Sequence, residues 1–116
     1  MIDDVSRLLP LSQAHLYILL ALRSEDKHGY AIMQDVRELS EGSYKLGPAT
    51  LYENLAKLVD LGVITEVLDS TAGDERRRYY RLTALGKRAL KEDVARLGRL
   101  VGRLDLRRVK GRENPA

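Results

Sequence analysis

The sequence predicts a mainly helical domain with one small β-hairpin, and three observations on the 116-residue chain support this fold class. Apolar residues recur at helical spacing in three stretches before residue 62. A β-branched run and an arginine- and tyrosine-rich run follow, with a polar turn between them. A last stretch, from about residue 84, again has helical spacing. The length suits a single domain with a modest core.

Two helices are expected in the first third of the chain. Residues 1–11 are expected to be a loose lead-in, because Pro10 disfavours helix in the residue before it. Ser12 fits the N-cap of a helix over about 13–23, and the body of this helix is apolar on nearly every side, so more than one face should be buried. A second helix is predicted from about His28 to Leu39.

The two histidines of the chain are interpreted as structural residues. No acid, cysteine or second histidine clusters near His28, so it is expected to start or cap the second helix rather than act as a ligand or base. His15 is expected to be a satisfied histidine within the first helix.

The third predicted helix, residues 48–61, has a marker at each end. Pro48 fits the first helical position, and Gly62 fits the position after the last turn, where a positive φ costs little. One face is leucine-rich and should pack on the core. Its residues are Leu51, Leu55, Leu58 and Leu61. The opposite side is small or polar and free to contact another molecule. It carries Ala49, Thr50, Glu53, Asn54 and Lys57.

A β-hairpin is predicted after the third helix. Residues 63–68 and 76–82 are the expected strands, joined by a polar turn over 69–75. Tyr80 and Leu82 should face one side, and Arg77, Tyr79 and Arg81 the other. Three helices followed by a hairpin is the order of a winged helix-turn-helix, with a longer connection before the third helix than the simplest version has.

A final helix is predicted over residues 84–106. Thr83 can cap it, and Gly86 is an awkward early residue. From Leu90 its apolar residues recur at alternating steps of four and three, which favours pairing with another helix. The alternative is packing on the first helix of the same chain. Pairing between subunits is favoured because little of the chain is left to cover a helix this far past the domain. The predicted dimerisation residues are Leu16, Leu20, Leu90, Val94, Leu97, Val101 and Leu104.

Composition excludes several classes of site. The chain has no cysteine, so it has no disulfide framework and no thiolate metal site. No stretch has the length of a membrane span and no signal pattern is present, which favours a cytoplasmic location. Residues 1–66 carry 6 basic and 10 acidic side chains, whereas residues 67–116 carry 14 and 7. Such asymmetry indicates a polyanionic partner met by one face. Residues 107–116 are expected to be a basic, disordered tail.

These features together predict contact with double-stranded DNA. A helix fits the major groove, and the N-terminal half of the third helix would meet base edges first. Thr50 can hydrogen-bond a base or a phosphate, Ala49 allows close approach, and Tyr52 and Lys57 suit phosphates. The arginine triplet 76–78 would lie along a backbone or in the minor groove, unless it only protects a strand edge. The candidate DNA-binding residues are Tyr44, Lys45, Ala49, Thr50, Tyr52, Glu53, Lys57, Arg76, Arg77 and Arg78.

The chain resembles the PadR family of winged-helix transcriptional regulators over about residues 12–104. The matching segments are Leu16–Leu22, His28–Ile32, Gly47–Tyr52, Leu58–Ile64 and Arg77–Gly86. The resemblance implies a homodimeric DNA-binding repressor of the short type with a single C-terminal helix. In that type the C-terminal helix packs on the partner's N-terminal helix. The family's groove-facing Thr and Tyr correspond to Thr50 and Tyr52. Its usual glycine in this motif is Ala49 here.

The resemblance thus divides the chain into a lead-in (1–11), a winged helix-turn-helix domain (12–83), a dimerisation helix (84–106) and a tail (107–116). The implied partners are a two-fold symmetric DNA operator, a second copy of the chain and a small-molecule effector that the sequence does not identify. Some short members bind flat aromatic drugs between Trp side chains. This chain has no Trp and no Phe, which argues against that mode.

The predicted function is therefore sequence-specific regulation of transcription, without cofactor or metal. A winged-helix module that contacts other proteins is the alternative, but Thr50, Glu53 and Lys57 make the outer face of the third helix polar, which argues against it. An enzyme is disfavoured, because no paired nucleophile and base, glycine-rich phosphate loop or metal cluster is visible.

Overall fold

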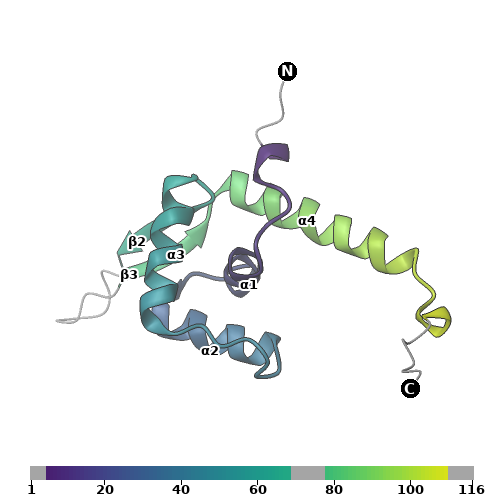
Figure 1. The fold of residues 1–116 in the computed structure, drawn as a ribbon. Helices are drawn as coiled ribbons and strands as arrows, with labels where there is room; N and C mark the ends of the chain where they lie inside the picture. Colours follow the sequence, from purple (N-terminus) through teal and green to yellow (C-terminus); the bar gives the residue numbers. More distant parts are fainter. Residues whose placement is uncertain (1–4, 69–77, 110–116) are drawn as a thin grey trace.

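The computed structural model of the chain describes residues 5–68 and 78–109, and it contains four α-helices, two short 3-10 helices and three strands within them (Figure 1). The helical elements are η1 (Ser6–Leu8), α1 (Gln13–Ala21), α2 (Gly29–Leu39), α3 (Pro48–Asp60), α4 (Ala84–Gly102) and η2 (Leu106–Arg108). The strands are β1 (Lys27–His28), β2 (Ile64–Leu68) and β3 (Arg78–Leu82). The expected mainly helical class with a small β-structure is confirmed.

The sheet has three antiparallel strands in the order β1-β3-β2, where the sequence predicted a hairpin of two. The additional strand is only two residues long, and Lys27 and His28 lie opposite Tyr80 and Tyr79 of β3. A pair of residues is too short to show the alternation that predicts a strand. The predicted turn over 69–75, together with Arg76 and Arg77, lies outside the described residues. Within β3, the prediction for Tyr80 and Leu82 is confirmed, because both are buried.

The core lies between the first three helices and the sheet. It combines Ile18 and Leu19 of α1 with the inner faces of the other elements, and all its largest side chains are fully buried. The other members include Ile32, Val36, Leu51, Leu55, Leu58 and Ile64. The predicted inner face of α3 is thus confirmed for three of its four leucines. The exception is Leu61, which remains 44% exposed beyond the end of the helix.

The predicted caps are present at the ends of the helices. The side chains of Ser12, His28 and Thr83 accept hydrogen bonds from the first turns of α1, α2 and α4. At the end of α3, Gly62 has a φ of 79°. The N–H groups of Gly62 and Val63 donate to the carbonyl groups of Val59 and Leu58, at 2.9 and 3.2 Å. This is the hydrogen-bond pattern of a Schellman motif.

The described part of the lead-in, residues 5–11, packs on the domain and is not the loose segment that the sequence predicted. Val5 is fully buried, and the N–H of Leu11 donates to Oδ2 of Asp93 in α4 at 3.4 Å. Asp93 is itself fully buried, and the guanidinium of Arg96 donates to its other oxygen at 2.8 Å. A buried carboxylate needs such partners, because its unpaired charge would be costly away from water. This contact joins the start of the chain to the middle of α4.

The final helix is shorter than predicted, and the backbone of its first turn packs closely against the backbone at Val63. It ends at Gly102 rather than residue 106, and η2 follows. Glycine has low helix propensity, which favours an end at this position. Near the start, a Cβ on Gly86 would collide with the carbonyl group of Val63. The glycine that looked awkward in the sequence therefore allows α4 to pass against the strand region. The predicted tail lies largely outside the described residues, which stop at 109.

Two negative findings apply to residues 5–68 and 78–109. None of the helices there has the length and apolar character needed to cross a membrane. No group of three or more potential metal-ligating side chains occurs in the same ranges.

His15 joins α1 to α3. Its Nε2 donates to Oδ1 of Asn54 at 3.1 Å, and Nδ2 of Asn54 donates to the carbonyl of Thr50 at 2.9 Å. Burial lowers the pKa of His15; the Asn54 hydrogen bond opposes this shift, and the charge of Lys57 adds to it. The histidine is therefore structural, as expected from the sequence, and the fold favours its neutral form.

We expect the free energy of unfolding to decrease as the pH falls below about 6.5, where the unfolded chain takes up a proton at His15 that the folded chain resists. Above that pH the neutral form is present in both states and the contribution of His15 is complete. A His15→Gln variant should show a smaller loss of melting temperature between pH 8 and pH 5. An equal loss in both proteins would contradict the assignment.

Gly86→Ala should destabilise the protein by about 1–3 kcal/mol, the usual cost of overpacking, because the obstacle is a backbone carbonyl that cannot turn aside. Gly98→Ala is the matched control. No neighbour lies within 4 Å of a Cβ at that position, so the change should stabilise α4 by up to about 1 kcal/mol. Urea unfolding at one protein concentration measures both, and equal effects would exclude the close-packing explanation.

Candidate nucleic-acid interface

The outer face of α3 is a continuous exposed surface of small and polar side chains. The buried leucines hold the opposite face in the core, so the helix presents this surface to solvent in a fixed orientation. Its exposed residues include Ala49, Thr50, Tyr52, Glu53 and Lys57, all of which the sequence predicted. Asn54 differs, because it is half-buried and its amide is used by His15 and Thr50. The structure thus gathers five of the candidate DNA-binding residues on one helix.

The first turn of α3 offers free backbone donors. Among the four α-helices described, α3 is the one whose N-cap side chain makes no hydrogen bond, because its N-cap is Gly47. Pro48 has no N–H, so the donors left in this turn belong to Ala49 and Thr50. Free N–H groups and the helix dipole favour negative charge at this end. The turn that carries the first two candidate residues is therefore suited to an anionic partner.

Tyr52 lies between α3 and the start of α2. A Cβ on Gly29 would collide with the Tyr52 hydroxyl, so the glycine leaves the space that the ring occupies. The tyrosine remains 50% exposed, and its hydroxyl is located at the N-terminus of α2. Reasoning from residue chemistry alone did not identify Gly29. Its only sequence signal was its place in the segment His28–Ile32, which carries the family resemblance.

The wing of this fold is the hairpin of β2 and β3. Its described residues offer fewer unpaired cations for DNA than the sequence suggested. Arg78 is exposed, but its Nε lies 3.1 Å from a carboxylate oxygen of Glu66 on the neighbouring strand. Arg81 donates to both oxygens of Asp26, at 3.0 and 2.8 Å, and so fastens β3 to the segment before β1. Exposed ion pairs are weak and can exchange for another anion. Arg76 and Arg77 lie outside the described residues.

Tyr44 and Lys45 precede α3 but differ in their surroundings. The ring of Tyr44 is half-buried and stacks on Tyr17 of α1, with centroids 5.2 Å apart. Its backbone is held by the Ser40 hydroxyl, which accepts from the Tyr44 N–H at 3.1 Å. The Tyr44 ring therefore packs within the domain. Lys45 is exposed beside the start of α3.

The predicted dimerisation stripe divides into two parts. Leu90, in the first half of α4, is buried in the core of its own chain. The C-terminal part of α4 extends away from the body formed by the other elements (Figure 1). Val94, Val101 and Leu104 are 45%, 66% and 54% exposed, and Leu100, which is not in the predicted stripe, is 50% exposed. Leu16, Leu20 and Leu97 are half-buried. Packing on the same chain thus accounts for the first part of the stripe and leaves the second uncovered.

Comparison with known proteins gives a consistent result. Residues 18–92 match the model of the transcriptional regulator PadR-like family. The transcriptional regulator Rv3488 of Mycobacterium tuberculosis is 37% identical over 81 residues, which cover 67% of this chain and 69% of the relative.

Two solved structures show the same fold. A transcriptional regulator from Clostridium thermocellum is similar over 95% of this chain and 99% of that one, with a TM-score of 0.67 and 27% identity. Bacillus subtilis PadR, in a crystal structure with operator DNA, is similar over 73% of this chain, with a TM-score of 0.64 and 27% identity. This chain covers only 48% of that longer protein.

The winged-helix neighbours confirm the predicted fold class, and the family model matches most of the range 12–104 over which the resemblance was predicted. With 75 consecutive residues (18–92) matching the family model, the chain belongs to the PadR-like family of transcriptional regulators.

Proposed function

We propose that the protein is a homodimeric repressor that binds double-stranded DNA, with α3 in the major groove and the wing against the adjacent backbone. The observation that carries the proposal is the outer face of α3, where Ala49, Thr50, Glu53 and Lys57 are all exposed on a helix whose other face is fixed in the core. Bacillus subtilis PadR, a relative in fold, has been crystallised with operator DNA. Arg76 and Arg77 remain sequence-based candidates for the backbone contact.

The residues of α3 should have distinct roles. Thr50 lies in the first turn, where a side chain in the groove reaches base edges, and Ala49 beside it permits close approach to a thymine methyl. Lys57 lies two turns later on the same exposed side and is suited to a phosphate. A protein-contact module would instead need apolar side chains on this face, and the exposed Glu53 and Lys57 disfavour that function.

Thr50→Ala should change the preference among duplexes, by about 1–3 kcal/mol at the base pair that it contacts. Lys57→Ala should weaken all duplexes by a similar factor and reduce the dependence of affinity on salt by about one phosphate contact. Gel shifts over a salt series, on DNA selected from a random pool, measure both effects. The absence of any duplex binding by the wild-type protein at low salt would reject the proposal.

The dimer would form through the uncovered part of α4. Of the exposed apolar residues, Val94, Leu100 and Val101 lie on one side of α4 and Leu104 follows its end. Exposed apolar patches usually mark interaction sites. Steps of four and three along the helix suit packing against another helix, and the half-buried Leu16 and Leu20 of a partner's α1 are the expected counterpart. A two-fold symmetric dimer predicts a two-fold symmetric operator.

Val101→Asp should convert the dimer to monomers, because the dimer would bury the new charge whereas the monomer leaves position 101 in water. Ala95→Asp is the control: this exposed position is turned about 120° from Val101 around the helix, so the dimer should persist. Leu97→Asp tests the half-buried part of the stripe. Sedimentation velocity distinguishes the species. A wild-type protein that is monomeric at micromolar concentration, or a Val101→Asp variant that stays dimeric, would refute this interface.

A further inference from the structure

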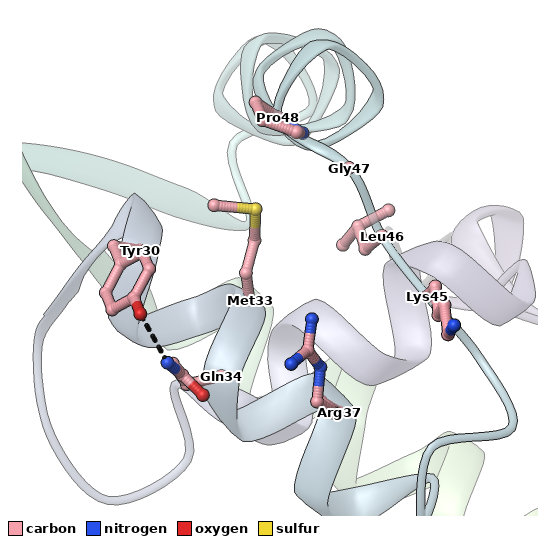
Figure 2. A pocket seen from close by; sticks show the side chains of 8 residues that line it. All are labelled: Tyr30, Met33, Gln34, Arg37, Lys45, Leu46, Gly47 and Pro48. Atoms are coloured by element: carbon pink, nitrogen blue, oxygen red, sulfur yellow. Dashed lines mark hydrogen bonds between the residues drawn. The ribbon is translucent and has the colours of Figure 1, made fainter.

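A cavity of about 390 Å³ lies between α2 and the segment that leads into α3. It opens beside Pro48, directly before the two candidate base-contacting residues Ala49 and Thr50. Figure 2 shows the side chains of α2 on one side and the segment 45–48 on the other, with the thioether of Met33 directed toward Pro48. The lining residues are Tyr30, Met33, Gln34, Arg37, Lys45, Leu46, Gly47 and Pro48.

Two cations at this cavity are not neutralised. Arg37 and Lys45 are both exposed, and neither has an ion-pair partner in the part of the chain that the structure describes. Other cations of the described residues are neutralised by a carboxylate within 4.0 Å, as Lys27 and Arg81 are, whereas exposed cations elsewhere, such as Lys57 and Arg99, also have no such partner there. The α2–α3 junction therefore concentrates positive charge that the fold itself does not use.

The cavity also has hydrogen-bonding groups on its α2 side. Nε2 of Gln34 donates to the Tyr30 hydroxyl at 2.6 Å, which leaves the hydroxyl hydrogen of Tyr30 available for another acceptor (Figure 2). Tyr30 is 62% exposed. Figure 2 shows the guanidinium of Arg37 between the Tyr30 hydroxyl and the Lys45 ammonium, so these donors lie at different places along the cavity, and an acceptor beside Arg37 would have one of them on each side.

The remaining wall is apolar. Leu46 is buried, Met33 is half-buried, and the rings of Tyr30 and Pro48 complete the surface. A bare inorganic anion would use the cations and leave this wall unoccupied. A sugar–phosphate unit of a nucleic-acid strand matches both parts, because its phosphate is anionic and the carbon-bound hydrogens of deoxyribose are apolar.

We propose that this cavity binds one phosphate of the DNA backbone, with its deoxyribose against Met33 and Pro48. The proposal rests on the DNA-binding function proposed above and adds Tyr30, Gln34 and Arg37 to the interface. The planar guanidinium of Arg37 would donate hydrogen bonds to two phosphate oxygens, and the ammonium of Lys45 would attract the phosphate through its charge. Because Pro48 is both part of the wall and the first residue of α3, this contact would set how far the helix enters the groove.

The test is a double-mutant cycle between the protein and the DNA. A series of operator duplexes, each with a single neutral methylphosphonate, is titrated with the wild-type protein and with Arg37→Ala. At one position in each half-site, removal of the phosphate charge should weaken wild-type binding about tenfold, as expected for a charge-assisted hydrogen bond. At that position the methylphosphonate should reduce the affinity of the Arg37→Ala variant little further. At every other position it should reduce the affinities of both proteins by the same factor. Arg37→Lys should retain only part of the coupling.

Arg99→Ala is the matched control, since it removes the same charge from an exposed position on α4. It should leave the coupling at every phosphate unchanged. Circular dichroism of each variant checks that it is folded. The absence of any position at which Arg37→Ala and the methylphosphonate are coupled would overturn the proposal, provided that the wild-type protein binds the unmodified duplex. If it does not bind that duplex, the proposed function itself fails.

A second experiment distinguishes binding of a phosphate in the DNA backbone from binding of a free phosphorylated molecule. Deoxyribose 5-phosphate is titrated into the DNA-free protein, and the amide resonances of Arg37, Lys45 and Gly47 are followed by NMR. We expect no saturable change at millimolar concentration, because one isolated phosphate contact is weak. Saturable binding without phosphate-specific coupling in the DNA series would instead assign the cavity to a small phosphorylated molecule and overturn the backbone assignment.

Discussion

The relative positions of α3, the sheet and α4 depend on a set of hydrogen bonds made by Thr83. Its partners are Gly62, Val63 and Gly86. The Thr83 hydroxyl donates to the carbonyl of Gly62 at 2.6 Å and accepts from the N–H of Gly86 at 3.0 Å. The N–H of Thr83 donates to the carbonyl of Val63 at 3.1 Å. One threonine thus ends β3, caps α4 and holds the end of α3. The surface proposed to contact DNA and the first half of α4 are therefore held in one arrangement.

Sequence reasoning succeeded where the signal is local. The structure contains the predicted caps at Ser12, His28 and Thr83 and the predicted proline and glycine at the ends of α3. It also buries three of the four leucines predicted for the inner face of α3. All of these features follow from the geometry of a single helix. The exposed face of α3 followed from the same periodicity. These features require no knowledge of the partner segments, because backbone hydrogen bonds and helical spacing specify them.

The features that sequence reasoning missed depend on contacts between distant segments. The strand Lys27–His28 exists because β3 lies beside it, and Val5 is ordered because the fold covers it. Pairing of Arg78 with Glu66 and stacking of Tyr44 on Tyr17 likewise depend on tertiary neighbours. The same limit applies to the cavity at Arg37, since α2 and the α2–α3 segment had to be placed together before two unpaired cations could be recognised as a group.

In the proposed dimer, the division of α4 at Asp93 would link the fold of this helix to the concentration of the protein. The first half belongs to the core of its own chain, whereas the second half carries exposed apolar side chains and glycines at positions 98 and 102. Such a segment gains little helical stability by itself, and in a dimer most of that stability would come from the partner. The concentration at which subunits associate would then also be the concentration at which the outer half of α4 becomes firmly helical. Assembly and local folding would be a single equilibrium, governed by how much of the protein is present.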